Sequence, residues 1–421
     1  MIPPDVKSFF FRNRIPGQLV IQITDRCNAR CPQCGMRVTE PFQRSSLPVD
    51  EIQRILESAA RQRFQAVSFT GGEPLLRLGE LTALIRHADA VGIALIRTGT
   101  NGFFFQNPEK PGFLSRVKHV ADALAATPLR NFWISIDSGV PEIHEKMRGL
   151  KGVISGIEKT LPLFHRRGLF PTANLGINRN LGGEVTRGLS RANFPHEEVY
   201  LSEFYDRYRT AFAAYFRFVI SLGFTIVNAC YPMSLGKKET ESGLSPVYAA
   251  TATEDIVHYT DSEKQMLFKA LGDTVRSFRS RIRIFSPLSS LHAMENRYAT
   301  PSRAMYPCRG GIDFFFVDAQ QGSTFPCGYR GKEDLGKFQT LDVSGRPDTP
   351  PCKACDWECF RDPSELSGPI LNGMRHPLGE LKKMTRNPQF YRHWAKDLLY
   401  YYACDFFNGR LPIHRHRLAS F

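Results

Sequence analysis

The 421-residue sequence has no apolar run of the length that a membrane-spanning helix needs, which is about eighteen residues. Its first residues, MIPPDVKSFFFRNRIP, contain prolines and scattered charges where a secretory signal would have a basic segment followed by an apolar one. The sequence also lacks internal repeats and any specific nucleic-acid motif. These absences predict a cytoplasmic protein with no transmembrane segment.

Basic residues outnumber acidic ones. The sequence contains 55 Lys and Arg but only 41 Asp and Glu, which gives a formal net charge of +14. Part of the positive charge lies near the C-terminus, in the segment HRHR at 414–417. One interpretation is an ordinary solvated surface. The other is an anionic partner, such as a small molecule, a nucleotide or a lipid headgroup.

The ten cysteines are spaced like metal ligands and not like a disulfide framework. Three stand together in CNARCPQC at 27–34, and three more in CKACDWEC at 352–359. Short spacings of this kind, in a chain without a signal peptide, are typical of metal binding. The sequence therefore predicts metal centres.

Strand-like and helix-like segments alternate from about residue 19 onward. In the segment 49–63, for example, Ile52, Ile55, Leu56 and Ala59 recur at the spacing of one helix face. This alternation predicts an α/β fold in which helices cover a parallel sheet, and right-handed crossovers curl it into a partial (β/α)6 barrel. The expected strands are 19–24, 66–70, 93–98, 132–137, 172–177 and 224–229. The expected helices are 49–63, 78–91, 113–126, 153–167, 198–222 and 261–279.

Four motifs follow or end an expected strand: the cysteine triplet, GGEP at 71–74, TNG at 100–102 and SID at 135–137. In parallel α/β barrels the carboxyl ends of the strands meet at one rim, where the chemistry takes place. The topology alone therefore predicts that these motifs lie near one another.

The C-x3-C-x2-C triplet of Cys27, Cys31 and Cys34, followed in order by GGEP, TNG and SID, resembles the signature of the radical S-adenosylmethionine (radical SAM) superfamily. The resemblance covers roughly residues 17–230 and implies that the three thiolates hold a catalytic 4Fe–4S cluster. The remaining iron would bind S-adenosyl-L-methionine (AdoMet), and electron transfer would release a 5′-deoxyadenosyl radical. The alternative is a structural zinc site, which usually has two pairs of ligands.

The resemblance also implies which residues hold AdoMet. The glycines of GGEP let the backbone approach a ligand, because no Cβ intervenes, and alternate residues of SID face the same side of a strand. Turn formation and capping are the structural alternatives for these motifs. The expected AdoMet-binding residues are Gly71, Gly72, Glu73, Pro74, Asn101, Ser135, Asp137 and Asn178.

Two further positions stand out. Cys230 ends the sixth expected strand and is a candidate catalytic residue near the substrate, although a lone cysteine is usually part of a core. Gln33 stands before the last cysteine of the triplet, where the family usually has an aromatic residue near the adenine. No aromatic ring can therefore pack from that position.

A second cysteine group follows a change of composition near residue 300. Cys308 and Cys327 enclose the segments IDFFFVDA, QQG and STFPC, which predict a strand, a turn and a returning strand. The pattern C-x13-G-x4-C resembles the β-hairpin of SPASM and Twitch auxiliary-cluster domains. The resemblance implies a second, auxiliary 4Fe–4S cluster held by Cys308, Cys327 and two of Cys352, Cys355 and Cys359, with a zinc ribbon as the alternative.

We expect four segments: an N-terminal extension (1–18), the radical SAM barrel (19–300), the auxiliary-cluster domain (301–365) and an aromatic, basic helical tail (366–421). Residues 236–260 are polar and rich in small residues, which predicts a surface loop or lid. In the tail, Cys404 is expected to pack in an aromatic helix, and the tail itself has a composition that also suits a lipid surface.

The sequence thus predicts an enzyme in which the radical takes a hydrogen atom from a substrate while the auxiliary cluster assists oxidation or bond formation. We expect a small-molecule, lipid-linked or peptide substrate and a reductant such as flavodoxin or ferredoxin. A first strand near residue 19 leaves no room for an N-terminal peptide-recognition domain, which disfavours leader-peptide substrates. The alternatives are a peptide-modifying radical SAM enzyme, a radical SAM fold retained for binding or electron relay, and a zinc-stabilised basic module that binds nucleic acid.

Overall fold

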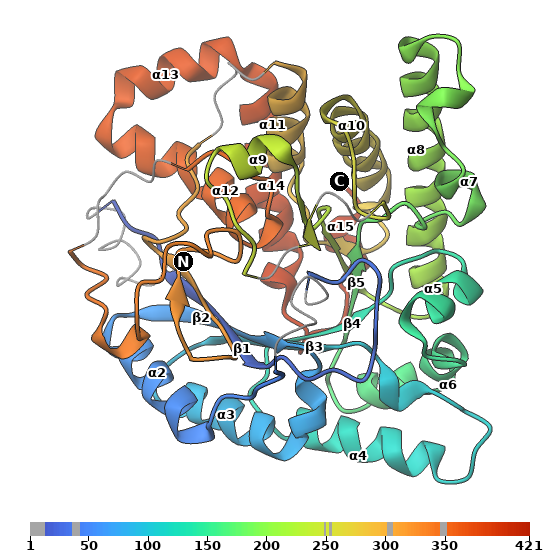
Figure 1. Ribbon diagram of the computed structural model, residues 1–421, viewed down its shortest axis with the longest axis vertical. Helices are drawn as coiled ribbons and strands as arrows, with labels where there is room; N and C mark the ends of the chain where they lie inside the picture. The colour runs from blue at the N-terminus through green and yellow to red at the C-terminus, as the bar shows by residue number, and fades with distance from the viewer. Residues whose placement is uncertain (1–12, 36–42, 248–249, 252–254, 301–305, 346–351) are drawn as a thin grey trace.

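The structure, a computed structural model, describes residues 13–35, 43–247, 250–251, 255–300, 306–345 and 352–421. Among these residues, nine strands form one sheet in the order β11-β10-β1-β2-β3-β4-β5-β6-β9 (Figure 1). Strands β1 to β6 are neighbours in chain order, and each pairs in parallel with the next. The described strands leave the sheet open, so the prediction of a partial (β/α)6 barrel is confirmed.

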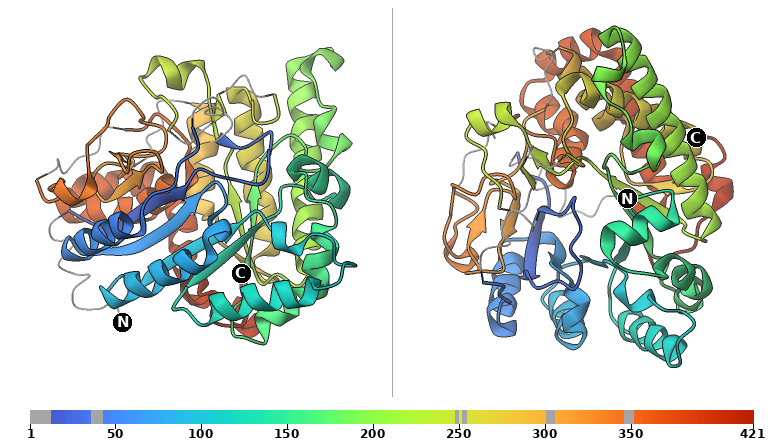
Figure 2. Two further views of the ribbon diagram at one scale, coloured as in Figure 1. Left: turned by 60° about the horizontal axis from the view of Figure 1, so that its bottom comes forward. Right: turned by 45° about the vertical axis from the view of Figure 1, so that its right-hand side comes forward.

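Helices connect the strands and form a layer outside the sheet (Figure 2). All the expected strands and helices form, and their ends differ from the expected ones by no more than two residues. The strands are β1 (Gly17–Thr24), β2 (Phe64–Gly71), β3 (Leu95–Thr100), β4 (Asn131–Ser135), β5 (Thr172–Gly176) and β6 (Ile226–Cys230). The expected helices are α2 (Val49–Arg61), α3 (Leu78–Ala90), α4 (Phe113–Ala125), α6 (Val153–His165), α8 (Glu197–Ser221) and α10 (Asp261–Phe278). Shorter helices that the sequence analysis did not anticipate are α5 (Pro141–Arg148) and α7 (Glu184–Arg187).

Side chains alternate along the barrel strands between the helix layer and the barrel interior. In β2, Val67 and Phe69 are fully buried in the apolar core, whereas Ser68 and Thr70 line an internal cavity. The apolar face of α2 packs into the same core, with Ile52 fully buried. Period-two alternation in the strands and helical periodicity outside them therefore build the two layers.

The cysteine-rich segment extends the barrel sheet. The predicted hairpin forms as β10 (Phe314–Val317) and β11 (Thr324–Phe325), which pair antiparallel. Strand β10 then pairs in parallel with β1, Leu19 opposite Phe315, so a single sheet runs from the barrel into the second module. The expected boundary after residue 365 falls inside α12 (Glu358–Arg375), and the division into segments stays a prediction.

Parts of the expected segments lie outside the described residues: 1–12 of the extension, 36–42, 248–249 and 252–254 of the barrel segment, and 301–305 and 346–351 of the auxiliary-cluster segment. The described part of the segment 236–260 contains α9 (Lys237–Glu241) and β8 (Ala250–Thr251). Strand β8 pairs in parallel with β7 (Ser234–Leu235) to form a separate two-stranded sheet.

The C-terminal tail packs against the barrel. Its helices are α13 (Pro377–Arg386), α14 (Pro388–Ala403) and α15 (Arg415–Leu418), and α11 (Leu288–Ala299) packs against α14. The Tyr400 hydroxyl donates to the carbonyl of Ile282 at 2.9 Å, next to the edge strand β9 (Arg283–Ile284). Cys404 is fully buried in an apolar cluster with Tyr400 and Phe407, as expected. None of the described helices has both the length and the apolar character needed to cross a bilayer.

Asp397 of α14 ties the tail to two other helices. Its carboxylate is fully buried and pairs with Arg279 at the end of α10. It also accepts hydrogen bonds from the backbone N–H groups of Leu288 and Ser289, at 3.0 and 2.8 Å, where α11 begins. A carboxylate at a helix N-terminus satisfies otherwise unpaired N–H groups, and here it also neutralises a buried cation.

Replacement of Asp397 by Ala should therefore lower the free energy of unfolding by about 3–5 kcal/mol, because Arg279 is left buried without a counter-ion. Urea denaturation followed by circular dichroism measures the change. The matched control is Asp122→Ala, which removes an exposed partner of Arg167 and should leave the midpoint nearly unchanged. Equal midpoints for wild type and Asp397→Ala would contradict this account.

Candidate active site

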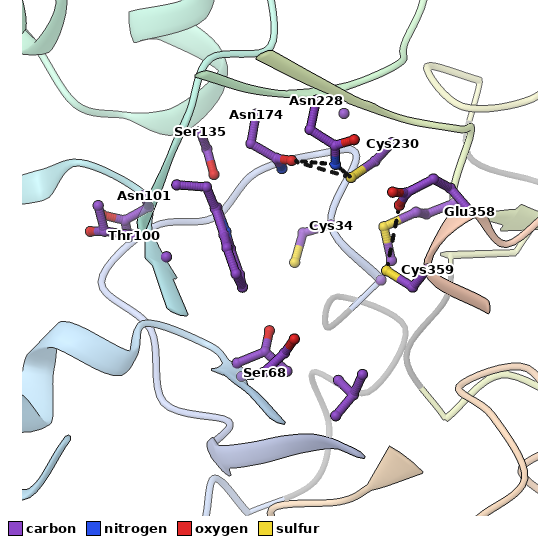
Figure 3. Close-up of a pocket in the computed structure, with 18 of the residues that line it drawn as sticks. Cys34, Ser68, Thr100, Asn101, Ser135, Asn174, Asn228, Cys230, Glu358 and Cys359 are labelled. Atoms are coloured by element: carbon purple, nitrogen blue, oxygen red, sulfur yellow. Dashed lines mark hydrogen bonds between the residues drawn. The ribbon is translucent and has the colours of Figure 1, made fainter. Parts of the chain in front are cut away.

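A cavity of about 1060 Å³ fills the barrel interior and opens at the carboxyl ends of the strands. Its walls come from the inward-facing positions of β1 to β6 and from the loops that follow them. Figure 3 shows side chains from several strands, among them Ser68, Ser135, Asn174 and Asn228, directed into the same space. The predicted rim motifs therefore meet at one cavity: its lining includes Cys27, Cys31, Cys34, Gly71, Gly72, Glu73, Pro74, Asn101, Ser135, Asp137 and Cys230.

The three cysteines of the triplet lie on one loop after β1. The backbone N–H of Cys34 donates to the carbonyl of Cys31 at 3.1 Å, which folds the loop back on itself. The Cys27 sulfur accepts from the N–H of Ala29 at 3.4 Å and from the Asn101 amide at 3.6 Å. Burial raises the pKa of Cys31 to about 12 and also raises that of Cys27, so neither ionises readily without a metal. A bound metal deprotonates a coordinating thiol outright, so these three thiols on one loop could still serve as ligands of a cluster.

The glycines of GGEP bring the end of β2 against the start of the cysteine loop. A Cβ on Gly71 would lie 1.9 Å from the Thr24 carbonyl oxygen, and one on Gly72 would lie 2.1 Å from that of Arg26. The N–H groups of Gly72 and Glu73 donate to these same two oxygens at 2.8 and 2.9 Å. The sequence predicts that these glycines allow a ligand to approach the backbone. In the structure, the close approach that requires them is to residues 24–26 of the same chain.

Glu73 connects GGEP with TNG. Its carboxylate is fully buried and accepts hydrogen bonds from the backbone N–H groups of Leu75 and Asn101, at 3.0 and 2.6 Å. Burial raises its pKa to about 7. Pro74 begins the 3-10 helix η2 (Pro74–Arg77), for which the Glu73 side chain acts as the N-terminal cap.

Asn101 combines the two roles that the sequence left open. Its side-chain oxygen accepts from the N–H of Phe103 at 2.9 Å, which shapes the turn into η3 (Phe103–Phe105). Its amide group donates to Asn28 at 2.8 Å and to the Cys27 sulfur. Asn101 therefore steadies the cysteine loop while it lines the cavity.

Asp137 is held by a network that the sequence did not reveal. Arg148 at the end of α5 forms an ion pair with its carboxylate at 2.6 Å, and the Gln33 amide donates to the same oxygen at 2.5 Å. The N–H of Gly176 donates to the other oxygen at 3.2 Å. Gln33, the departure from the family pattern, thus joins the cysteine loop to β4, and its amide oxygen is buried without a partner among the described residues.

Asn178 lies behind this network. It is fully buried, and its amide donates to the carbonyls of Asp137 and Gly176 at 2.9 and 2.7 Å. It is absent from the described lining of the cavity, so its predicted contact with AdoMet gains no support. By contrast, Ser135 and Asp137 both line the cavity, as expected for alternate positions that face the same side.

Four cysteines of the second group surround a small cavity of their own. Cys308, Cys327, Cys352 and Cys355 line it together with Trp357. The N–H of Cys308 donates to the carbonyl of Cys352 at 2.9 Å, which brings the hairpin against the later loop. Burial raises the pKa of Cys308, Cys327 and Cys355, and the neighbouring cysteines raise it further.

Cys359 is separate from these four and faces the large cavity, on the first turn of α12 (Figure 3). Its thiol donates to the carboxylate of the adjacent Glu358 at 3.4 Å. Cys230 lies on the same wall, where its thiol donates to Asn174 and accepts from Asn228, both at 3.4 Å. The polar residues Asn174 and Asn228 were missed by the sequence analysis, although their alternation with apolar neighbours inside expected strands was a usable signal.

The zinc alternative concerns both cysteine groups. Among the described residues, no three His, Cys, Asp or Glu side chains are arranged as ligands of a single metal ion. A four-iron cube is larger than one ion and holds its thiolates farther apart, so this finding bears on a mononuclear site and not on a cluster.

Known proteins are similar to the part of the chain that contains the first cysteine group. The model of the radical SAM superfamily matches residues 21–180. A probable GTP 3′,8-cyclase of Thermococcus kodakarensis is 29% identical over 163 residues, which is 38% of this chain and 48% of that protein. The GTP 3′,8-cyclase of Alkaliphilus metalliredigens is 32% identical over 148 residues, which is 34% of this chain and 42% of that protein. This chain spans less than half the length of these curated relatives.

Solved structures with partial similarity include Streptococcus suis SuiB bound to the precursor peptide SuiA, with 14% identity and a TM-score of 0.47 over 80% of this chain and 66% of that one. Another is anSMEcpe with bound AdoMet and the Cp18Cys peptide, with 16% identity and a TM-score of 0.48 over 90% of this chain and 99% of that one. The cysteine triplet and its three partner motifs at the cavity rim lie in or beside the part of the chain that matches this family model. Residues 21–180 are therefore similar to the radical SAM superfamily.

Proposed function

We propose that this protein cleaves AdoMet reductively and uses the resulting radical to abstract hydrogen from a substrate bound in the barrel. The observation that carries the proposal is the convergence of Cys27, Cys31 and Cys34 with GGEP and TNG on a single cavity. A cluster held by these thiolates would supply the electron that cleaves the sulfonium. The chain itself binds and orients the two reactants.

The rim residues have distinct tasks in this proposal. The backbone of residues 72–74, fixed by hydrogen bonds to the cysteine loop, presents its remaining polar groups to the methionine moiety of AdoMet. Among the described residues, the Ser135 hydroxyl has no hydrogen-bond partner and lines the cavity, so it is free to meet a ribose hydroxyl. Asp137 is already held by Arg148 and Gln33, and this suits a group that orients a ligand without moving.

We further propose that Cys308, Cys327, Cys352 and Cys355 hold an auxiliary 4Fe–4S cluster. The shared small cavity supports this set of four and leaves Cys359 out. Trp357 lines both cavities, so the four cysteines lie close to the space proposed for the substrate. Such proximity supports a role in accepting an electron from a substrate radical, which would make the overall reaction an oxidation.

The substrate is proposed to be a small polar molecule. The cavity must hold AdoMet as well, and its strand-borne walls include Ser68, Thr70, Asn174 and Asn228. Hydroxyl and amide groups of this kind recognise polar substituents. Cys230, on the same wall, stays a candidate for contact with the reacting part of the substrate. The cytoplasmic location and a flavodoxin- or ferredoxin-type reductant belong to the same proposal.

Cys31→Ala is expected to abolish formation of 5′-deoxyadenosine from AdoMet, because two thiolates cannot retain the catalytic cluster. Anaerobically purified protein is reduced with dithionite, and the nucleoside is quantified by chromatography. Cys404→Ala is the matched control, since Cys404 lies in an apolar cluster of the tail and should leave the yield unchanged. Undiminished 5′-deoxyadenosine in Cys31→Ala, or wild-type protein that contains stoichiometric zinc and no iron after reconstitution, would refute the proposal.

Cys327→Ala and Cys359→Ala form a second matched pair. Wild type should contain about eight irons; Cys327→Ala should keep about four, because only the catalytic cluster remains, and Cys359→Ala should keep about eight. Cys327→Ala should also cleave AdoMet while losing product. Iron and sulfide assays with electron paramagnetic resonance measure these outcomes. Loss of about four irons in Cys359→Ala would instead make Cys359 an auxiliary ligand.

A further inference from the structure

Arg97 reaches into the cavity from the middle of β3. It faces inward between Ser68 of β2 and Asn131 of β4, which are its neighbours in the sheet register. Asn101, at the rim, lies four residues farther along the chain, which corresponds to about 13 Å at about 3.3 Å per residue. Arg97 therefore marks a deep part of the cavity, well below the cysteine loop.

The guanidinium of Arg97 has no partner in the part of the chain that the structure describes. No side chain or carbonyl there accepts a hydrogen bond from it, no carboxylate lies within ion-pair distance, and its Nε atom is fully buried. Burial lowers its pKa, which reflects the cost of keeping an unpaired cation away from water. Arg148, another largely buried arginine that lines this cavity, is paired with Asp137 at the rim.

The acidic groups that face Arg97 lie beyond ion-pair distance from it. Glu358 and Cys359 are close enough to act on it electrostatically but form no ion pair with it. Burial raises the pKa of Glu358 and of Cys359, which favours their neutral forms, and the Cys359 thiol donates to Glu358. Asp362, one turn farther along α12, accepts a hydrogen bond from Tyr231 at 2.9 Å, and burial raises its pKa too. A cation, two thiols and two carboxyl groups whose pKa values burial raises thus share one wall.

An aromatic surface lies between Arg97 and the rim. The Trp133 indole packs directly on Gly99, where a Cβ would lie 1.9 Å from the indole nitrogen. Both residues line the cavity, and Gly99 is two positions beyond Arg97 on the inner face of β3. A molecule that follows β3 from the rim to Arg97 therefore passes this indole.

We propose that Arg97 binds an anionic group of the substrate, a carboxylate or a phosphate, and that Trp133 contacts the flat portion next to it. The inference rests on the proposed function and names the substrate class for the same cavity. A guanidinium presents a fork of N–H donors that matches both anions. Arg97 would hold one end of the substrate deep in the barrel. The reacting carbon of the substrate would then lie nearer the rim, where the proposed cleavage of AdoMet takes place.

Fragment binding to the reconstituted full-length protein with AdoMet present tests this inference. Isothermal titration calorimetry compares phenyl phosphate and benzoate with the neutral benzamide. We expect at least one anion to bind more tightly than benzamide, and Arg97→Gln to weaken that anion by about tenfold to a hundredfold, as for loss of a charge-assisted hydrogen bond. The preferred anion distinguishes a phosphate from a carboxylate substrate.

Arg54→Gln is the matched control, because it removes an equal charge from an exposed position on α2 and should change none of the three affinities. Arg97→Met is the second variant: it keeps a long side chain and removes the unpaired charge, so its melting temperature should not fall. Equal anion affinity in wild type and both Arg97 variants, or no preference for anions over benzamide, would overturn the inference. AdoMet cleavage and iron content, measured on the same samples, report separately on the proposed function.

Discussion

The contact between the ends of β1 and β2 determines the geometry of the whole rim. Two carbonyl oxygens, of Thr24 and Arg26, receive the N–H groups of Gly72 and Glu73, and the glycines alone permit so close an approach. The cysteine loop begins at this contact, so Cys27, the first cysteine of the triplet, is fixed relative to the sheet. Glu73 and Asn101 then transmit the same constraint to the end of β3. Any side chain at Gly71 or Gly72 would separate the loop from the strands that orient it.

An ion pair and a hydrogen bond stabilise the rim from the opposite side. Arg148 and Gln33 converge on Asp137, so a charge pair and an amide link the last turn of the cysteine loop to β4. The pair is almost completely buried, so each charge neutralises the other in a place where an isolated charge would destabilise the fold. The deep part of the cavity is organised differently, because the Arg97 cation there is left without a counter-ion. One arginine therefore serves the scaffold, and the other faces the space that a substrate would fill.

The amino-acid sequence predicted the barrel well, because helical and strand periodicities are local properties of the chain. Topology then placed the cysteine triplet, GGEP, TNG and SID together. Three features needed the structure. The spacing of Cys352, Cys355 and Cys359 does not show which two of them lie beside Cys308. Their positions depend on the residue at which α12 begins. The role of Gly71 depends on its close approach to Thr24 of β1, which the sequence around Gly71 does not reveal. Arg97, Asn174 and Asn228 became cavity residues only when the sheet curled, since an inward position in one strand does not identify what it faces.

The pairing of β10 with β1 has a consequence for how such a chain can diversify. Backbone hydrogen bonds set the register of Leu19 opposite Phe315, although almost three hundred residues separate them in sequence. The spacing between the two cysteine groups is thus dictated by neighbouring strands of a rigid ladder and not by the connecting chain. Insertions or deletions in the intervening loops would leave that distance intact. The relative placement of the two cysteine groups and the sequences of the connecting loops are accordingly free to evolve independently.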